Sequence, residues 1–137
     1  MDTITRKPPA GTAAVVDDAF MTRWFEAWKR KSVEAILELV TDDVVLESAF
    51  GPEAHGKRFV GKKAFAEGCI RYFAAMEGVT SSDRAYVLMG DTGFTEVTIS
   101  YRGPDGKQMS TRVCDLFAFR DGKVASKRAY SKRFAES

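Results

Sequence analysis

One acidic residue, Asp115, stands in the apolar stretch RVCDLFAF. In the alternating pattern of a strand, its neighbours on both faces are largely apolar, so either orientation places the carboxylate among apolar groups. Such an environment disfavours the charged form unless a cation compensates. Two interpretations stay open: an aspartate satisfied locally by a backbone amide or a nearby Lys or Arg, or a perturbed acid in a pocket.

A second group of candidates lies in the basic stretch SKRAYSKR near the C-terminus. If Phe119 pairs with Lys123 across the turn, Lys127 lies directly opposite Asp115 and shares its face. If Asp121-Gly122 forms a two-residue turn instead, Arg128 takes that place. The sequence alone leaves this register open.

Other candidates have simpler explanations. His55 lies in a glycine-rich stretch and is predicted to be an exposed loop residue. Asp42 and Asp43 are predicted to form a turn before a strand. No phosphate-binding loop, dinucleotide fingerprint or nucleophile elbow occurs, so no cofactor is expected.

Composition narrows the possible functions. The 137 residues are 45% hydrophobic and 29% charged with a net charge of +2, which disfavours a nucleic-acid or membrane partner. The two cysteines, Cys69 and Cys114, have no metal-ligand spacing, and with one histidine they make a zinc site improbable. We expect both to be free thiols in a reducing cytoplasm.

Hydrophobic periodicity predicts helices first. Residues 1–13 show little periodicity and are expected to be a loose arm before one domain over residues 14–137. From Val16 an aromatic stripe at helical spacing includes Phe20, Trp24 and Trp28 and is predicted to be core more than ligand contact. Further helices are predicted over 32–40, with Ser32 as N-cap, and over 62–76, where Tyr72 shares the apolar face.

The rest of the chain predicts strands. They are expected over 44–48, 84–89, 96–102, 108–119 and 123–132, with glycine-containing turns between them. Helices followed by an antiparallel meander predict an α+β fold, with the helices on one face of a curved sheet.

The last hairpin, CDLFAFRDGKVASKRAYSK, resembles that of the nuclear transport factor 2-like superfamily, a cone-shaped fold that includes ketosteroid isomerase and the SnoaL-like polyketide cyclases. The segments VEAILELVTDDVVLES and GKRFVGKKAF agree with the layout of that fold, and the resemblance covers about residues 15–132. It implies three N-terminal helices packed on a cystatin-like curved sheet. Because this fold carries many functions, the resemblance identifies the fold better than the activity.

The resemblance carries over only part of a known catalytic set. Asp115 falls on the oxyanion-hole aspartate of ketosteroid isomerase, but the general base is replaced by Ser48 and the helix-one tyrosine by Trp24. The last-strand aspartate of limonene-epoxide hydrolase falls on Ala129, and one histidine cannot supply the histidine pair of scytalone dehydratase. Standard steroid isomerisation is therefore not expected.

The resemblance also implies which side chains face the cone. Asp115 and Lys127 are expected to form an ion pair within roughly 4 Å. They would be the catalytic pair, with Ser48 and Tyr101 as secondary hydrogen-bonding groups. The ligand-binding residues implied are Trp24, Ser48, Val97, Ile99, Tyr101, Val113 and Ala129.

The function expected is a pocket for a small apolar molecule, with proton transfer on a carbonyl compound of isomerase, cyclase or dehydratase type. The alternative is a non-catalytic ligand-binding or dimerisation module of the same fold. The resemblance also implies a homodimer through the outer face of the sheet, an isologous interface. The outer-face residues expected are Thr98, Ser100, Arg102, Arg112, Cys114, Leu116 and Ala118.

Overall fold

The computed structural model describes residues 16–134, and the predicted arm over residues 1–13 lies outside this range. Three helices and six strands follow in chain order: α1 (Asp18–Lys29), α2 (Val33–Leu37), β1 (Val40–Glu47), β2 (Arg58–Val60), α3 (Lys62–Ala75), β3 (Glu77–Met89), β4 (Thr92–Arg102), β5 (Gln108–Arg120) and β6 (Lys123–Phe134). None of the helices in this range is long and apolar enough to cross a membrane.

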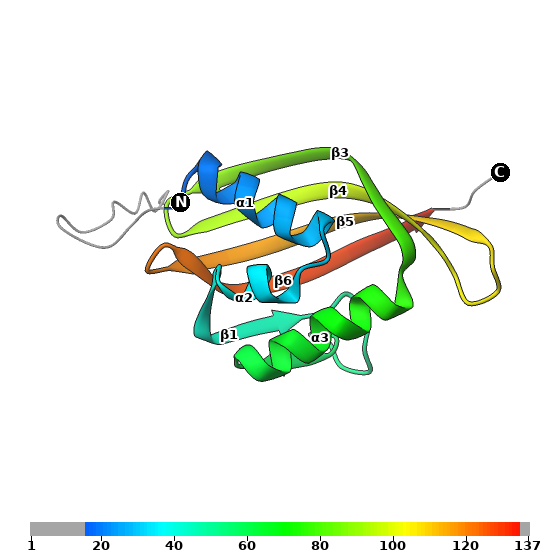
Figure 1. Ribbon diagram of the computed structural model, residues 1–137, viewed down its shortest axis with the longest axis horizontal. Helices are drawn as coiled ribbons and strands as arrows, with labels where there is room; N and C mark the ends of the chain where they lie inside the picture. Colours follow the sequence, from blue (N-terminus) through cyan, green and yellow to red (C-terminus); the bar gives the residue numbers. More distant parts are fainter. Residues whose placement is uncertain (1–15, 135–137) are drawn as a thin grey trace.

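The strands form a single mixed sheet in the order β2-β1-β6-β5-β4-β3. Only β1 and β6 pair in parallel; the other neighbouring strands are antiparallel. The three helices lie on one face of this sheet (Figure 1). The predicted α+β class, with helices on one face of the sheet, is confirmed.

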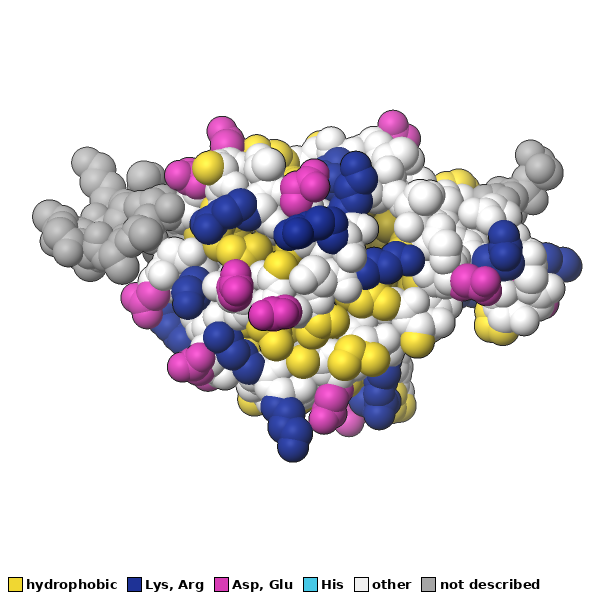
Figure 2. All heavy atoms as spheres, in the orientation of Figure 1, with side chains coloured by type: hydrophobic (Ala, Val, Ile, Leu, Met, Phe, Trp, Pro, Cys, Tyr) yellow, Lys and Arg dark blue, Asp and Glu magenta, His cyan; other side chains and the backbone are white. Residues whose placement is uncertain are grey.

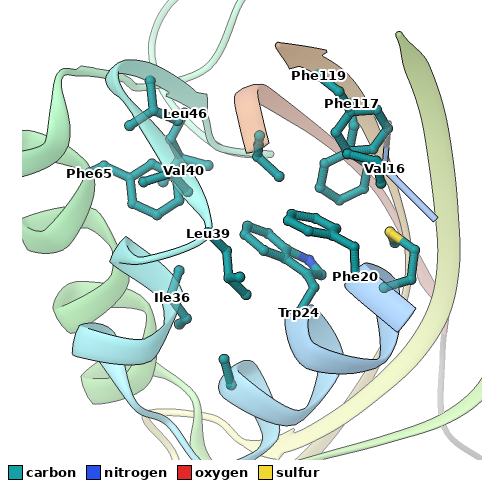
Figure 3. Packing of buried hydrophobic residues seen from close by; sticks show 14 of the residues in the cluster. Val16, Phe20, Trp24, Ile36, Leu39, Val40, Leu46, Phe65, Phe117 and Phe119 are labelled. Carbon is teal, nitrogen blue, oxygen red and sulfur yellow. The ribbon is translucent and has the colours of Figure 1, made fainter. Parts of the chain in front are cut away.

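The helices begin where the sequence supplies caps. Asp17 accepts a hydrogen bond from Phe20 N at 2.9 Å, and Ser32 accepts one from Ala35 N at 3.2 Å, so each satisfies a free backbone donor of its helix. In α1 the buried face brings Phe20 and Trp24 against Phe119 and Phe117 of β5 (Figure 3). The ring centroids lie 6.2 and 5.6 Å apart, so aromatic packing holds α1 on the sheet.

The boundary between the second helix and the first strand differs from the prediction. The helix ends at Leu37 instead of residue 40, and Asp42 and Asp43 belong to β1 instead of a turn before it. Pairing with β6 explains the early strand, because Val124 N donates to Leu39 O at 2.9 Å and Val40 lies beside Val124. The strand register shifts before Val45, so this stretch is an irregular part of β1.

The first strand after α3 is also longer than predicted. β3 begins at Glu77 instead of residue 84, directly after the helix. It is an edge strand, and its register against β4 shifts twice, so most of its first half is exposed and carries no apolar alternation. An exposed edge strand gives little periodic signal in the sequence.

The β5–β6 hairpin settles the register that the sequence left open. Asp121 and Gly122 both have positive φ, 54° and 72°, which is the two-residue turn typical of tight hairpins. Ala125 then forms a bulge, because Phe119 pairs with Val124 whereas Ala118 pairs with Ser126. Lys127 therefore lies opposite Phe117, and Asp115 lies opposite Ala129. Neither predicted alignment holds, since neither allowed for the bulge.

Candidate functional site

A cavity of about 630 Å³ lies between the helices and the inner face of the sheet. Its size is within the range of small-molecule sites. Its lining includes side chains of α1, α3, β3, β4, β5 and β6 and of the segment after β1. On the helix-bearing side of the molecule, apolar side chains gather at the surface with both basic and acidic side chains around them (Figure 2).

All the residues predicted for the site border this cavity. They are Trp24, Ser48, Val97, Ile99, Tyr101, Val113, Asp115, Lys127 and Ala129. Alternation along the strands explains the grouping, because residues two apart on β4, β5 or β6 share one face. The Ala125 bulge matters here, because the extra residue in β6 decides which of its side chains face the cavity.

The polar centre of the cavity is an ion pair. Lys127 Nζ lies 3.2 Å from Asp115 Oδ1, and the two side chains are 12% and 13% exposed. The two atoms are close enough to form an ion pair, but their geometry does not meet the requirements of a hydrogen bond. Although Lys127 is not directly opposite Asp115, it lies on the same face two residues along the hairpin, and its long side chain spans that offset.

Aromatic rings surround this pair. Lys127 Nζ lies 5.1 Å from the centroid of the Trp28 ring, a cation–π contact. Trp28 in turn packs against Trp24, Tyr72 and Phe73, with ring centroids 5.6, 5.7 and 5.6 Å away. The ammonium group is thus held between a carboxylate and an apolar wall. Of the predicted aromatic stripe, Phe20 is core, Trp24 is buried between core and cavity, and Trp28 is half-buried at the cavity.

Tyr72 is a cavity residue that was not among the predicted site residues. Burial, with smaller contributions from Asp115 and Tyr101, raises the pKa of its hydroxyl to about 12. At neutral pH the phenol is therefore neutral and able to donate a hydrogen bond. A signal existed in the sequence, because a tyrosine on the apolar face of a helix brings a hydroxyl into an otherwise apolar interior.

Two of the polar candidates are engaged elsewhere. The Ser48 hydroxyl donates to Phe50 O at 2.6 Å and accepts from Lys57 N at 3.3 Å, so it holds the segment after β1. His55 Nε2 lies 3.1 Å from Glu53 Oε2, and His55 does not border the cavity.

The cysteines do not supply a nucleophile. Cys69 and Cys114 are free thiols, as predicted. Burial raises the pKa of Cys69 to about 11, and burial with nearby acidic groups also raises the pKa of Cys114, so both thiols are protonated at neutral pH. Among residues 16–134 no group of three or more His, Cys, Asp or Glu side chains is placed to hold a metal ion.

Comparison with known proteins identifies the family. The pattern of the SnoaL-like domain matches residues 21–127, which is most of the chain. The chain belongs to the SnoaL-like domain family. A comparison with curated proteins gives no match.

Solved structures agree with the SnoaL-like fold. A protein of ketosteroid isomerase-like fold from Catenulispora acidiphila, in complex with trimethylamine, has a TM-score of 0.71 at 18% identity and covers 84% of this chain and 86% of its own. A candidate polyketide cyclase from Xanthomonas campestris has a TM-score of 0.69 at 20% identity, and the alignment covers 82% of this chain and 87% of the cyclase. A nuclear transport factor 2-like protein from Anabaena variabilis has a TM-score of 0.69 at 19% identity, and the alignment covers 86% of this chain and 89% of the Anabaena protein. At these identities the likeness shows the fold alone.

Proposed function

We propose that the protein binds a small, largely apolar carbonyl compound in this cavity and transfers a proton on it. The observation that carries the proposal is the Asp115–Lys127 pair, nearly buried in a cavity that is otherwise mostly apolar. Removing two charged groups from water is costly, and replacing such a pair by apolar residues is often neutral or stabilising. A charged pair kept in this position is therefore better explained by a ligand than by stability.

The two groups have complementary roles. The Lys127 ammonium group would polarise the carbonyl oxygen and stabilise the negative charge that develops on it. The Asp115 carboxylate would accept the proton from the carbon next to the carbonyl and return it at a second position. Tyr72, neutral at physiological pH, would be a second donor for the carbonyl oxygen. Isomerisation, cyclisation and dehydration of a carbonyl compound all use such steps.

A direct test uses 2-acetylnaphthalene as the probe. We expect it to raise the melting temperature of the protein, and the protein to accelerate exchange of the acetyl protons for deuterium, measured by NMR in D₂O. Asp115→Asn should abolish the acceleration while the probe still binds. Asp43→Asn, which changes an acidic residue of β1 that does not border the cavity, should leave the exchange rate unchanged.

The same measurements separate the two functions under consideration. Binding of ketones without any acceleration of exchange would favour the alternative, a non-catalytic ligand-binding module. No binding by any aromatic ketone would contradict the pocket function itself.

We do not propose the standard steroid isomerase reaction. Ser48 stands at the position of that enzyme's general base, and its hydroxyl donates a hydrogen bond to the backbone carbonyl of Phe50. Trp24 stands at the position of its tyrosine and packs on Phe117. We expect no conversion of a 5-en-3-one steroid, followed by the ultraviolet absorbance of the conjugated product. Robust turnover would show that a different group is the base.

The outer face of the sheet supports a second proposal, a homodimer through that face. Val87, Phe94 and Leu116 lie in one row across β3, β4 and β5, and the exposed fractions of Val87 and Phe94 are 42% and 40%. Tyr130 lies beside Cys114 in the next row and is 54% exposed. A self-complementary apolar strip of this kind suits an isologous interface.

Light scattering at micromolar concentration tests the dimer. We expect the mass of a dimer for the unmodified protein and of a monomer for Leu116→Glu. A monomeric unmodified protein would contradict this interface. The cytoplasmic location remains a prediction from cysteine usage.

A further inference from the structure

The cavity is bordered by more basic than acidic side chains. Its charged lining residues are Lys29, Arg84, Asp115 and Lys127. Lys127 is paired with Asp115, so among the described residues that border the cavity the other two cations have no acidic counterpart. Lys29 lies in the last turn of α1, where a basic side chain stabilises the C-terminal end of a helix. Arg84 has no such role, because it lies in the middle of the edge strand β3.

A bulge in β3 brings Arg84 to the cavity side of the sheet. The register against β4 shifts between Ser82 and Ala85, so that Asp83 and Arg84 together lie opposite one residue of β4. Asp83 has a φ of 53°, a left-handed conformation that is uncommon outside glycine. In an unbroken strand Ser81 and Arg84 would face opposite sides, whereas here both border the cavity. Bulges that re-aim a side chain in this way are frequent next to functional sites.

The Arg84 guanidinium group is held in place but has no ion-pair partner. Its Cζ lies 4.2 Å from the centroid of the Phe25 ring, and its Nη2 donates to Ser81 Oγ at 2.9 Å. Within residues 16–134 it forms no ion pair. Partial burial lowers the pKa of the guanidinium group, and the attraction of Glu26 only opposes this change. A cation in this situation is stabilised when an anion binds to it.

Arg84 is also accessible and suitably distant from the ion pair. It is an exposed residue that borders the cavity, so a ligand in the cavity can reach it. The residue opposite it on β4, Val97, pairs with Val113 of β5, and Asp115 lies two residues farther along β5. Two strand spacings and two residues correspond to roughly 12 Å between the backbones of Arg84 and Asp115. A ligand of two fused rings with a polar group at each end has a comparable length.

We propose that Arg84 binds a carboxylate of the ligand, and that the substrate is an apolar carbonyl compound with this acidic group at its far end. The planar guanidinium group matches a carboxylate and can donate two parallel hydrogen bonds to it. The carbonyl oxygen of the same ligand lies at Lys127, and Lys29 adds to the positive potential around the carboxylate. This inference rests on the proposed function and narrows its substrate class from an apolar ketone to an apolar keto acid.

A matched pair of ligands tests the assignment. The probes are 2-acetylnaphthalene and 6-acetyl-2-naphthoic acid, which differ only in the far carboxylate, and dissociation constants are measured by calorimetry. We expect the acid to bind the unmodified protein about tenfold more tightly, the value of a charge-assisted hydrogen bond at an exposed site. Arg84→Gln should remove most of that preference and leave the affinity for the neutral ketone unchanged. Arg84→Lys, which keeps the charge without the planar fork, should retain part of the preference.

Arg23→Gln is the matched control. Arg23 is an exposed arginine of α1 whose Cζ lies 5.6 Å from the centroid of the Phe20 ring, and it does not border the cavity. The control removes the same charge and the same kind of ring contact, so the preference for the acid should stay as it is in the unmodified protein. Salt gives a further readout without substitution: 0.5 M salt should reduce the preference, because an exposed cation is screened, and should not weaken the neutral ketone.

Each contrary result has a distinct meaning. Equal affinity of the two probes for the unmodified protein would overturn the carboxylate site and leave the carbonyl-binding function standing. A preference that persists in Arg84→Gln, or that Arg23→Gln removes equally, would overturn the assignment to Arg84. Binding of the acid alone would support the carboxylate site and show that the ketone group by itself is not sufficient for binding. If neither probe binds the unmodified protein, the proposed function fails together with this inference.

Discussion

The inner face of β5 is packed at one end and hollow at the other. At the packed end Phe117 and Phe119 stack on each other, with ring centroids 5.7 Å apart, and contact Trp24 and Phe20 of α1. At the hollow end Thr111, Val113 and Asp115 face the cavity. One strand therefore supplies both the core and the site, and the aromatic side chains of α1 mark where one ends and the other begins.

This difference separates residues kept for stability from residues kept for function. Side chains at the packed end fill space that would otherwise be void, so their removal costs free energy. Side chains at the hollow end border space that is already open, and the polar ones among them lower stability instead of raising it. Substitutions at the two ends of the strand should therefore have opposite consequences for stability and ligand binding.

The largest expected effect is at the packed end. Phe117→Ala should lower the free energy of unfolding by about 3–5 kcal/mol, because it leaves a cavity beside Trp24 and Phe119. Val113→Ala, on the same face at the hollow end, should cost only about 1 kcal/mol. Urea unfolding followed by tryptophan fluorescence measures both, and equal losses would contradict the division of β5 into two ends.

The second prediction concerns the charge pair at the boundary. Lys127→Met should lower the free energy of unfolding by about 3 kcal/mol at pH 7, because the Asp115 carboxylate remains nearly buried without its cation. The double variant Asp115→Leu/Lys127→Met should be about as stable as the unmodified protein, since no unpaired charge remains. A double variant as unstable as Lys127→Met alone would show that the pair stabilises the fold and would weaken the argument for a ligand.

The sequence predicted the packed end better than the hollow end. Aromatic residues at helical spacing predicted the buried face of α1, and this prediction holds. In RVCDLFAF apolar residues occupy both faces of the strand, so the sequence left two interpretations of Asp115 open, and the structure places this residue at the cavity. The Asp115–Lys127 contact was expected from family resemblance, but both pairings considered for the hairpin were wrong because the Ala125 bulge leaves no mark in the residue types. Trp28 and Tyr72 border the cavity but were not predicted as site residues, because the sequence does not show which aromatic side chains have open space beside them in the packed structure.

The third prediction concerns Tyr72, whose pKa of about 12 lies above its ordinary value of 10 because of burial and the nearby Asp115. The folded protein therefore keeps the phenol proton where the unfolded chain loses it. Stability is unaffected below pH 10 and falls as the pH rises towards 12, by roughly 2–3 kcal/mol in total. Tyr72→Phe should remove this part of alkaline unfolding, measured by urea titrations between pH 9 and 12. Tyr130→Phe, at an exposed site, is the control, and an equal change there would contradict the effect.

The smallest expected effect is at an ion pair that has no apolar surroundings. Arg120 contacts Asp43 at the surface, and its hydrogen bond lowers the pKa of that carboxyl below the ordinary value of 3.8. Any stabilisation is therefore present at pH 7 and is lost as the pH falls through and below 4. Because both groups are exposed to water and screened by salt, Arg120→Gln should lower the melting temperature by no more than about 2 °C at pH 7.

The loss in melting temperature should shrink further in 0.5 M salt, whereas the loss in Lys127→Met should persist there, because little solvent reaches the buried carboxylate. A loss in Arg120→Gln as large and as salt-resistant as that in Lys127→Met would mean that the position of a pair relative to the cavity does not determine its energetic role.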